Sequence, residues 1–145
     1  MSKTNTHETD DLLLKFNNTN MGLVGDATGL RGSTAAGSLF FSLHTADPGE
    51  AGDQTTSEVT YTSYGRASKG RNATDFTVTG NAVTVNSTVT FPAGTGGSGT
   101  ATHWGLGASA SGAGKLMYKG TISPTIVTGN GVTPTLASGT VVTED

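Results

Sequence analysis

The stretch Phe76-Thr77-Val78-Thr79-Gly80-Asn81-Ala82-Val83-Thr84-Val85 decides the fold class of this chain. Apolar and polar residues alternate on both sides of its centre, and a period of two is that of a strand with one buried face. A two-residue Gly-Asn connection between two such runs is a strong signal for a β-hairpin. We therefore expect antiparallel strands at 76–79 and 82–85.

Short runs of the same kind recur from residue 38 to the end of the chain. Residues 38–44 (SLFFSLH) predict a strand with Leu39, Phe41 and Leu43 on one face. A further strand with a bend is expected at 58–70, and others at 89–92, 103–108, 115–121, 122–128, 132–137 and 140–143, with loops at 45–56 and 93–100. About nine or ten short strands separated by turns predict an all-β fold, an antiparallel β-sandwich or jelly roll.

The composition agrees with strands and turns around a weak core. The chain has 145 residues, the length of one domain, with 22 Gly, 33% hydrophobic residues and a formal net charge of −3. This charge is too small to keep the chain unfolded by self-repulsion. Because a small domain with few apolar residues has little to bury, we expect contacts with other subunits to complete its stability.

The N-terminal segment differs in composition from the rest of the chain. We expect an arm at 1–37 followed by the β-sandwich domain at 38–145. Acidic residues precede an apolar run, with Thr9 as the expected cap, which is typical of the start of a helix. A helix this short is not stable alone in water, so its apolar face packs either on its own domain or on a neighbouring subunit. The candidate residues for an interface with a neighbouring subunit are Leu12, Leu13 and Phe16.

Two motifs, a group of carboxylates and a Gly-rich stretch, could hold a ligand. Neither is followed or spaced as its ligand requires. Four carboxylates, those of Asp47, Glu50, Asp53 and Glu58, could offer oxygen ligands to Ca²⁺, but the EF-hand spacing is absent and a solvated loop is favoured. Residues 94–99 match G-x-G-x-x-G, but strand-like residues follow in place of the helix that a dinucleotide site needs. We expect a loop there, and no cofactor or metal.

The remaining candidates for chemistry favour structural roles. His44 could meet Glu58 or Asp47 as a general base, but no nucleophile motif accompanies it. The large rings could anchor an interface or stack on a sugar, although core positions are favoured for them; they are Tyr61, Tyr64, Trp104 and Tyr118. A basic patch of Arg66, Lys69 and Arg71 could pair with the acidic loop or with a partner. We predict no catalytic residue and no enzyme activity.

Composition also excludes several classes of partner and location. No run of 18 apolar residues is present, so no transmembrane helix is expected, and no basic amphipathic helix suggests binding to a membrane surface. The polar N-terminus lacks the apolar segment of a signal peptide, so we expect synthesis in a cytoplasm and no secretion by that route. Cysteine is absent, and the scattered Lys and Arg residues argue against nucleic-acid binding.

A series of stretches along the chain carries a family resemblance. They are 42–50 (SLHTADPGE), 56–66 (TSEVTYTSYGR), 89–93 (VTFPA), 112–116 (GAGKL), 131–136 (GVTPTL) and 143–145 (TED). In this order, and over almost the whole chain, they resemble a family of small structural proteins of tailed bacteriophages and prophages, often labelled tail fibre or virion proteins. The resemblance implies a component of the virion, and it carries no catalytic or ligand residues.

The resemblance leaves the position in the virion open, and the shape of the chain favours one alternative. A fibre shaft is usually long and repetitive, whereas this chain has 145 residues and no internal repeat that we recognise. A compact β domain with an arm that laps onto its neighbours suits a capsid decoration (cement) protein, which binds the outside of the head shell and stabilises it. We expect the major capsid protein and copies of itself as partners, in a homo-oligomer that is a trimer as first expectation. The alternatives are a tail-associated protein, either a fibre or an adaptor, and a host-glycan binding module.

Overall fold

The structure is a computed structural model that describes residues 3–22, 24, 32 and 34–144. In this part of the chain one helix and nine strands follow one another: α1 (Asn5–Asn17), β1 (Ser38–His44), β2 (Ala67–Gly70), β3 (Phe76–Thr79), β4 (Ala82–Val85), β5 (Val89–Thr90), β6 (Ser98–Gly107), β7 (Leu116–Gly129), β8 (Thr135–Leu136) and β9 (Val141–Thr143). The strands form three antiparallel sheets, so the predicted all-β fold with one short N-terminal helix is confirmed.

The chain divides into two compact units that are discontinuous in sequence. The first unit contains the segment up to residue 38 together with residues 70–88 and 137–145, and the second contains residues 39–69 and 89–136. The N-terminal segment, which we expected to be an arm at 1–37, is therefore grouped with the hairpin and the C-terminal strand. The sequence pattern contains no sign of this grouping because the segments are far apart along the chain.

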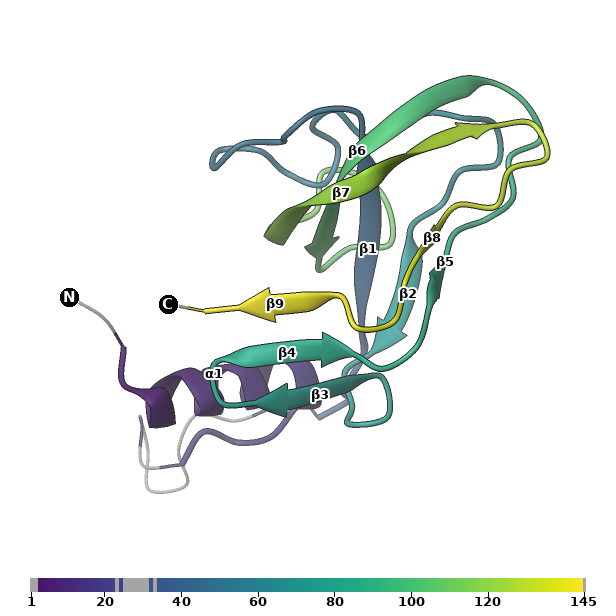
Figure 1. The fold of residues 1–145 in the computed structure, drawn as a ribbon. Coiled ribbons are helices and arrows are strands. Elements are labelled where there is room, and N and C mark those ends of the chain that lie inside the picture. Colours follow the sequence, from purple (N-terminus) through teal and green to yellow (C-terminus); the bar gives the residue numbers. More distant parts are fainter. Residues whose placement is uncertain (1–2, 23, 25–31, 33, 145) are drawn as a thin grey trace. The chain divides into compact units, whose positions relative to one another are not determined.

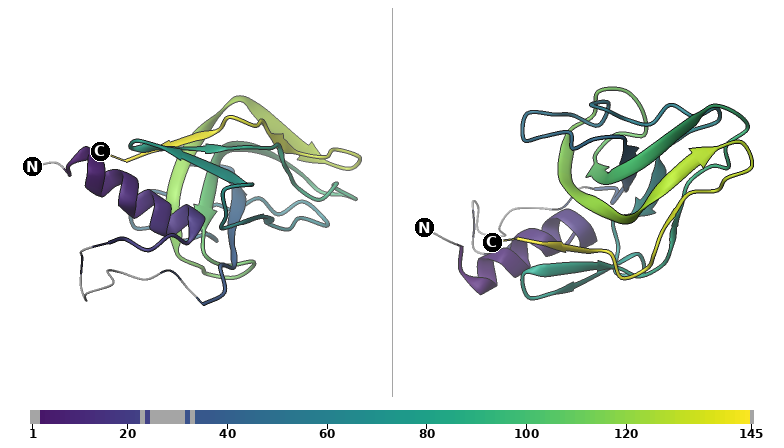
Figure 2. Two further views of the ribbon diagram at one scale, coloured as in Figure 1. Left: turned by 90° about the horizontal axis from the view of Figure 1, so that it is seen from below. Right: turned by 45° about the horizontal axis from the view of Figure 1, so that its top comes forward.

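The first unit is built on the predicted hairpin. β3 pairs with β4 in the expected register, from Phe76 opposite Val85 to Thr79 opposite Ala82, and β9 adds to the other edge of β4. α1 lies alongside this hairpin (Figures 1 and 2). The side chains buried in this unit are mostly apolar, and they include Leu12, Phe16, Phe76, Val83, Val85 and Val142. The rings of Phe16 and Phe76 meet edge to face with their centroids 5.1 Å apart.

The helix begins earlier than the sequence predicted. Its N-cap is Thr4, in extended conformation, whereas Thr9 lies inside the helix and its hydroxyl donates to the carbonyls of Asn5 and Gly80. The prediction of Thr9 as the cap was wrong because polar residues also occupy the first helical turn. The helix ends as expected at the Asn-rich segment, where Asn18 takes the left-handed conformation with φ 55°. In the part of the chain that the structure describes, no helix is long and apolar enough to cross a membrane.

Charged side chains fix both ends of the chain within the first unit. The ammonium groups of Lys3 and Lys15 lie 2.7 and 2.6 Å from the two carboxylate oxygens of Glu144, so they join the helix to the C-terminal segment. Arg71 closes the C-terminal end of the helix, where it donates to the carbonyls of Leu14 and Lys15, each at 2.6 Å. The positive charges of Lys15 and Arg71 at the C-terminal end of α1 also compensate the helix dipole.

The second unit contains a four-stranded sheet and a two-stranded ribbon. The order in the larger sheet is β2-β1-β6-β7, and β5 pairs with β8 in the smaller one. The predicted inward face of β1 is confirmed, because Leu39, Phe41 and Leu43 are all at most 5% exposed. Phe41 stands opposite Leu106, and Leu43 opposite Trp104, so the apolar residues of β1 and β6 share one face of the sheet.

Two predicted elements of the second unit were wrong in extent. The strand expected at 58–70 is reduced to β2, because residues 57–66 turn twice and both Ser57 and Ser63 have positive φ. The Gly-rich loop expected at 93–100 is shorter, since β6 already begins at Ser98. In this segment, pairing with β7 overrides the low strand propensity of glycine and serine.

The strands predicted at 115–121 and 122–128 form one long strand, β7, which runs beside β6 over its length (Figures 1 and 2). The predicted break is present as a shift in register. Ala101 stands opposite Ile126 and His103 opposite Thr121, so β7 advances five residues where β6 advances two. Residues 122–125 of β7 lie between these two pairs, across from Thr102 of β6, and form an irregularity that contains Pro124.

The position of α1 yields a test with two neighbouring leucines. Leu12 is fully buried in the first unit, whereas Leu13 is partly exposed. We expect Leu12→Ala to lower the free energy of unfolding by about 2–5 kcal/mol, because it leaves a cavity beside the hairpin. Leu13→Ala, the matched control, should cost about 1 kcal/mol or less. Urea unfolding of the purified full chain measures both, and equal costs for the two variants would contradict this packing.

Candidate functional site

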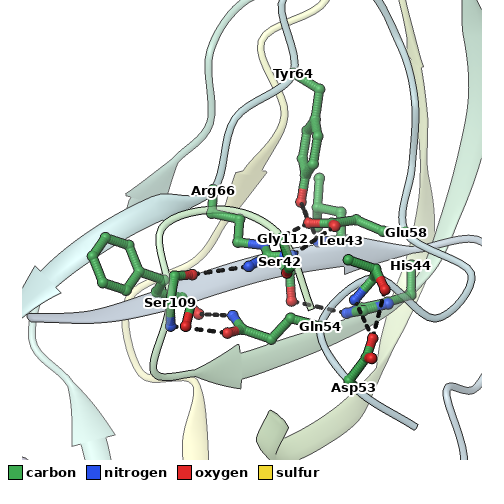
Figure 3. A network of polar contacts seen from close by, with 12 residues as sticks. Ser42, Leu43, His44, Asp53, Gln54, Glu58, Tyr64, Arg66, Ser109 and Gly112 are labelled. Atoms are coloured by element: carbon green, nitrogen blue, oxygen red, sulfur yellow. Dashed lines mark hydrogen bonds and ion pairs between the residues drawn. The ribbon is translucent and has the colours of Figure 1, made fainter. Parts of the chain in front are cut away.

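A network of buried polar side chains occupies the second unit (Figure 3). It starts on β1 with Ser42 and His44. Their side chains lie on one face of the sheet and that of Leu43 lies on the other, yet both residues are 0% exposed. The loop that follows β1 supplies Gln54, which is also 0% exposed. We call residues 47–58, which carry four carboxylates, the acidic loop. Buried polar groups cost free energy unless they are hydrogen-bonded, so each partner in this network matters.

The centre of the network is an ion pair between Glu58 and Arg66. The guanidinium donates to both carboxylate oxygens, from Nε to Oε1 and from Nη2 to Oε2, each at 2.8 Å. The same guanidinium donates to the carbonyls of Ser109 at 2.9 Å and Gly112 at 2.8 Å. The Arg66 side chain is only 2% exposed. A planar, five-donor group is suited to bind one carboxylate and two carbonyls at once, and a lysine in its place could not.

Tyr64 connects this ion pair to β1. Its hydroxyl accepts a hydrogen bond from the Leu43 N–H at 3.1 Å and donates to Glu58 Oε1 at 2.8 Å. Burial raises the pKa of the Tyr64 phenol, with the neighbouring Glu58 carboxylate acting in the same direction. The phenol therefore stays protonated and remains a donor to Glu58.

His44 is held in a single tautomer by its two partners. Its Nδ1 lies 2.8 Å from the Thr56 carbonyl, which can only accept, so Nδ1 carries the proton and Nε2 accepts from the Ser42 hydroxyl at 2.8 Å. Burial lowers the pKa of His44. The predicted side-chain partners Glu58 and Asp47 are not the ones observed, although the backbones of His44 and Glu58 form a β-bridge. The pair resembles a nucleophile and its base, but Ser42 and His44 are both 0% exposed and offer a substrate no access.

Two glycines of β6 make room for the network. A Cβ atom at Gly105 would lie 2.7 Å from His44 Nε2 and 2.7 Å from Ser42 Oγ, and one at Gly107 would collide with the Gln54 amide. Gln54 uses this space to donate to the Phe40 carbonyl at 3.3 Å and to accept the Ser109 N–H at 3.0 Å. The Gly-x-Gly spacing of β6 is thus required by close approach.

The carboxylates considered as a Ca²⁺ site lie in different places. Asp53 accepts the N–H and the hydroxyl of Thr55, at 2.8 and 2.6 Å, while Glu58 binds Arg66. Asp47 and Glu50 lie 3.0 and 3.1 Å from the Lys119 ammonium on β7. Of the residues that the structure describes, no three His, Asp or Glu side chains gather closely enough to hold a metal ion.

A pocket of about 280 Å³ adjoins this lysine. It lies between the acidic loop and the first part of β7, and it is lined by Gly49, Glu50, Gly52, Leu116, Met117, Tyr118 and Lys119. The Gly49 N–H and the Lys119 ammonium lower the pKa of Asp47, and these carboxylates raise the pKa of Lys119 in return. Asp47 and Lys119 therefore form an ion pair of two charged groups at neutral pH.

The aromatic, basic and interface residues that the sequence singled out do not gather at one place. Tyr61 and Trp104 are 3% and 8% exposed, which agrees with a core role, while Tyr118 is partly exposed at the pocket. The basic patch of Arg66, Lys69 and Arg71 is divided, since Arg66 pairs with the acidic loop and Arg71 caps α1. Of the predicted interface residues, Leu12 and Phe16 are 0% exposed within the first unit, and Leu13 is partly exposed.

The G-x-G-x-x-G stretch serves backbone pairing. The Gly94 N–H donates to the Val132 carbonyl and the Gly94 carbonyl accepts from Gly131, each at 2.8 Å. A Cβ at Gly94 would collide with the Gly129 carbonyl. A strand follows at Ser98, as the sequence indicated, and not the helix of a dinucleotide site.

The sequence did not reveal Gln54 or the depth at which Arg66 lies. Gln54 stands in a polar loop and nothing in its spacing distinguishes it from solvated neighbours. The available signal was the pair Gly105 and Gly107 within an apolar strand, since glycine in a strand often marks the close approach of another group.

Comparison with known proteins gives one family. Residues 22–144, which include β1 to β9 and none of α1, match the family described as podophage GP4 fiber I protein gp80. This confirms the resemblance to phage structural proteins that the quoted stretches carry. No curated protein matches the chain.

The ion pair yields a stability test. Arg66→Met leaves the Glu58 carboxylate, which is 14% exposed, without its partner, and we expect a loss of about 2–4 kcal/mol in the free energy of unfolding, less than for a fully buried pair. Lys115→Met, an exposed site in the same unit, should change it by about 0.5 kcal/mol or less. The double variant Glu58→Gln/Arg66→Met should regain part of the loss because no unpaired charge is left. Denaturant unfolding measures the free energy of unfolding of each variant. If Arg66→Met loses no more of it than Lys115→Met does, the ion pair does not have the role assigned to it.

His44 yields a test against pH. Because burial lowers its pKa below the ordinary 6.5, the unfolded chain binds a proton that the folded chain does not. The stability that the neutral ring contributes is complete above about pH 6.5 and is lost as the pH falls further. We expect His44→Gln to be less stable at pH 7.5 and to lose less stability between pH 6.5 and 5 than the unmodified chain. His7→Gln, at an exposed site, is the control, and identical pH profiles for His44→Gln and the unmodified chain would contradict the assignment.

Proposed function

Because the chain belongs to the family of the podophage GP4 fiber I protein gp80, it is a structural protein of a bacteriophage virion, and we propose that it is a component of the tail. It would act there as a fibre or as an adaptor to which a fibre attaches. The observation that carries this proposal is the match over residues 22–144 to a family described as a fibre. The match includes every strand of the fold, so the shared part is the β structure and not the helix.

The packing of α1 bears on the choice between tail and head. The sequence favoured a capsid decoration protein because an apolar arm could lap onto neighbouring shell subunits. Leu12 and Phe16, the core of that apolar cluster, are covered within the first unit. The argument for decoration from a free apolar arm therefore loses its support, and the family description then favours the tail.

We propose that the protein acts by binding and not by catalysis. The one Ser–His pair of the network is fully buried, and its hydrogen bonds are those of a structural group. We further propose that the protein forms a homo-oligomer, with a trimer as first expectation, because tail components are arranged around a rotation axis. As its partners we propose other proteins of the tail. If the protein instead decorates the capsid, its partner is the major capsid protein.

Capsid decoration is the second candidate, and one observation favours it. Fibre shafts are usually repetitive, whereas this sequence contains no internal repeat that we recognise. The two candidates differ in how many copies each particle holds.

Copy number and position in purified virions test the proposal. A tail component follows the low-order symmetry of the tail, so we expect on the order of ten copies per particle, whereas a shell component would be present in hundreds. Quantitative mass spectrometry with isotope-labelled peptides measures the number. Gold-labelled antibody against the protein should mark the tail in electron micrographs, and labelling spread over the head would overturn the proposal in favour of decoration.

A further inference from the structure

β7 forms one margin of the four-stranded sheet. In the order β2-β1-β6-β7 it has β6 on one side, and no strand of the described residues on the other. It is the longest strand in that part of the chain, with 14 residues, and its exposed residues are Thr121, Ser123, Pro124, Thr125 and Val127. The margin of a sheet is a template on which another extended segment can pair.

The pocket beside Lys119 opens along this margin. Four consecutive residues of β7, from Leu116 to Lys119, line it. Because successive side chains of a strand point to opposite faces, a space lined by four in a row lies along the edge and not over one face. β6 occupies one edge of β7, which leaves the outer edge for the pocket. The opposite wall is the acidic loop at Gly49, Glu50 and Gly52.

The charges at this pocket favour a cationic occupant. Asp47 and Glu50 share the single ammonium of Lys119, so the cluster carries one excess negative charge. Glu50 is 94% exposed and Asp47 53%, and both carboxylates keep room for further donors. Lys119 itself shows that the loop can hold an ammonium group 3.0–3.1 Å from its carboxylates. Leu116 and Met117 supply apolar contact for the stem of a long basic side chain.

We propose that β7 and the acidic loop together form the docking site for an extended, basic segment of a neighbouring virion protein. The segment pairs as a strand with the outer edge of β7 beyond Lys119, and one of its Arg or Lys side chains enters the pocket toward Glu50. Backbone pairing gives affinity, and the charged pocket selects the side chain. This inference rests on the proposed structural role in the virion and names the kind of partner that such a role needs. The irregularity at 122–125 limits the pairing to a short segment on one side of Pro124.

The first experiment uses the full chain and short acetylated peptides that alternate valine and threonine around one central residue. With a central arginine, the peptide should shift the backbone amide resonances of residues 47–52 and 119–123. The affinity should fall by about tenfold or more in the variant Asp47→Asn/Glu50→Gln, and it should fall with added salt. Asp10→Asn on α1 is the matched control, and it should leave the affinity unchanged.

Three results would overturn the inference. These are equal binding of a peptide with a central glutamate, resonance shifts that map away from both segments, and no binding by the arginine peptide at millimolar concentration. In intact virions, a photo-crosslinking residue at Thr121 should couple to a peptide that contains Lys or Arg, and the same residue at Thr77 should not. A virion with the protein on its tail but without the Thr121 crosslink would leave the proposed function intact and reject the docking site.

Discussion

The buried ion pair between Glu58 and Arg66 is the interaction on which the loops of the second unit depend. A charged pair removed from water is stable only when its remaining donors and acceptors are also satisfied. Here Tyr64 supplies a donor to the carboxylate, and the carbonyls of Ser109 and Gly112 accept from the guanidinium. Segments that are distant in sequence are thereby held at fixed positions around one carboxylate.

This arrangement compensates for a composition poor in apolar residues. Only 33% of the chain is hydrophobic, so a large apolar core is not available to order the long loops. Instead, Gln54 and His44, which are both 0% exposed, tie the acidic loop to β1 and to the segment after β6 by hydrogen bonds. Hydrogen bonds of this kind are directional, so they set the loop conformation more narrowly than apolar contacts do. The surface that the acidic loop presents beside β7 is a consequence of this buried layer.

The sequence predicted the parts of the fold that are local. The hairpin at 76–85, the strand 38–44 and the end of the helix at its Asn-rich segment all follow from alternation or turn chemistry, and all are confirmed. The grouping of α1 with that hairpin and with β9 could not be predicted, because it depends on contacts such as those of Lys3 and Lys15 with Glu144. Single residues that act through long-range contacts leave no periodic signal.

The same distinction applies to the site. The sequence suggested that the patch with Arg66 could pair with the acidic loop or with a partner. It did not indicate how deeply Arg66 lies, because charge patterns do not report depth. For His44 a structural role was favoured correctly, yet with the wrong partners, since Ser42 and the Thr56 carbonyl were not considered. The family to which the chain belongs is one of phage structural proteins, as the resemblance had implied.

Hydrogen exchange in an ion-pair variant tests the central claim most directly. In Arg66→Lys, which keeps the positive charge but loses the planar fork, the amides of Gln54, Val59 and Gly114 should exchange at least about tenfold faster than in the unmodified chain. The amides that join β5 to β8 in the same unit should keep their protection. Equal protection of the loop amides in the two proteins would contradict the central role of the ion pair, because the loops would then be ordered without it.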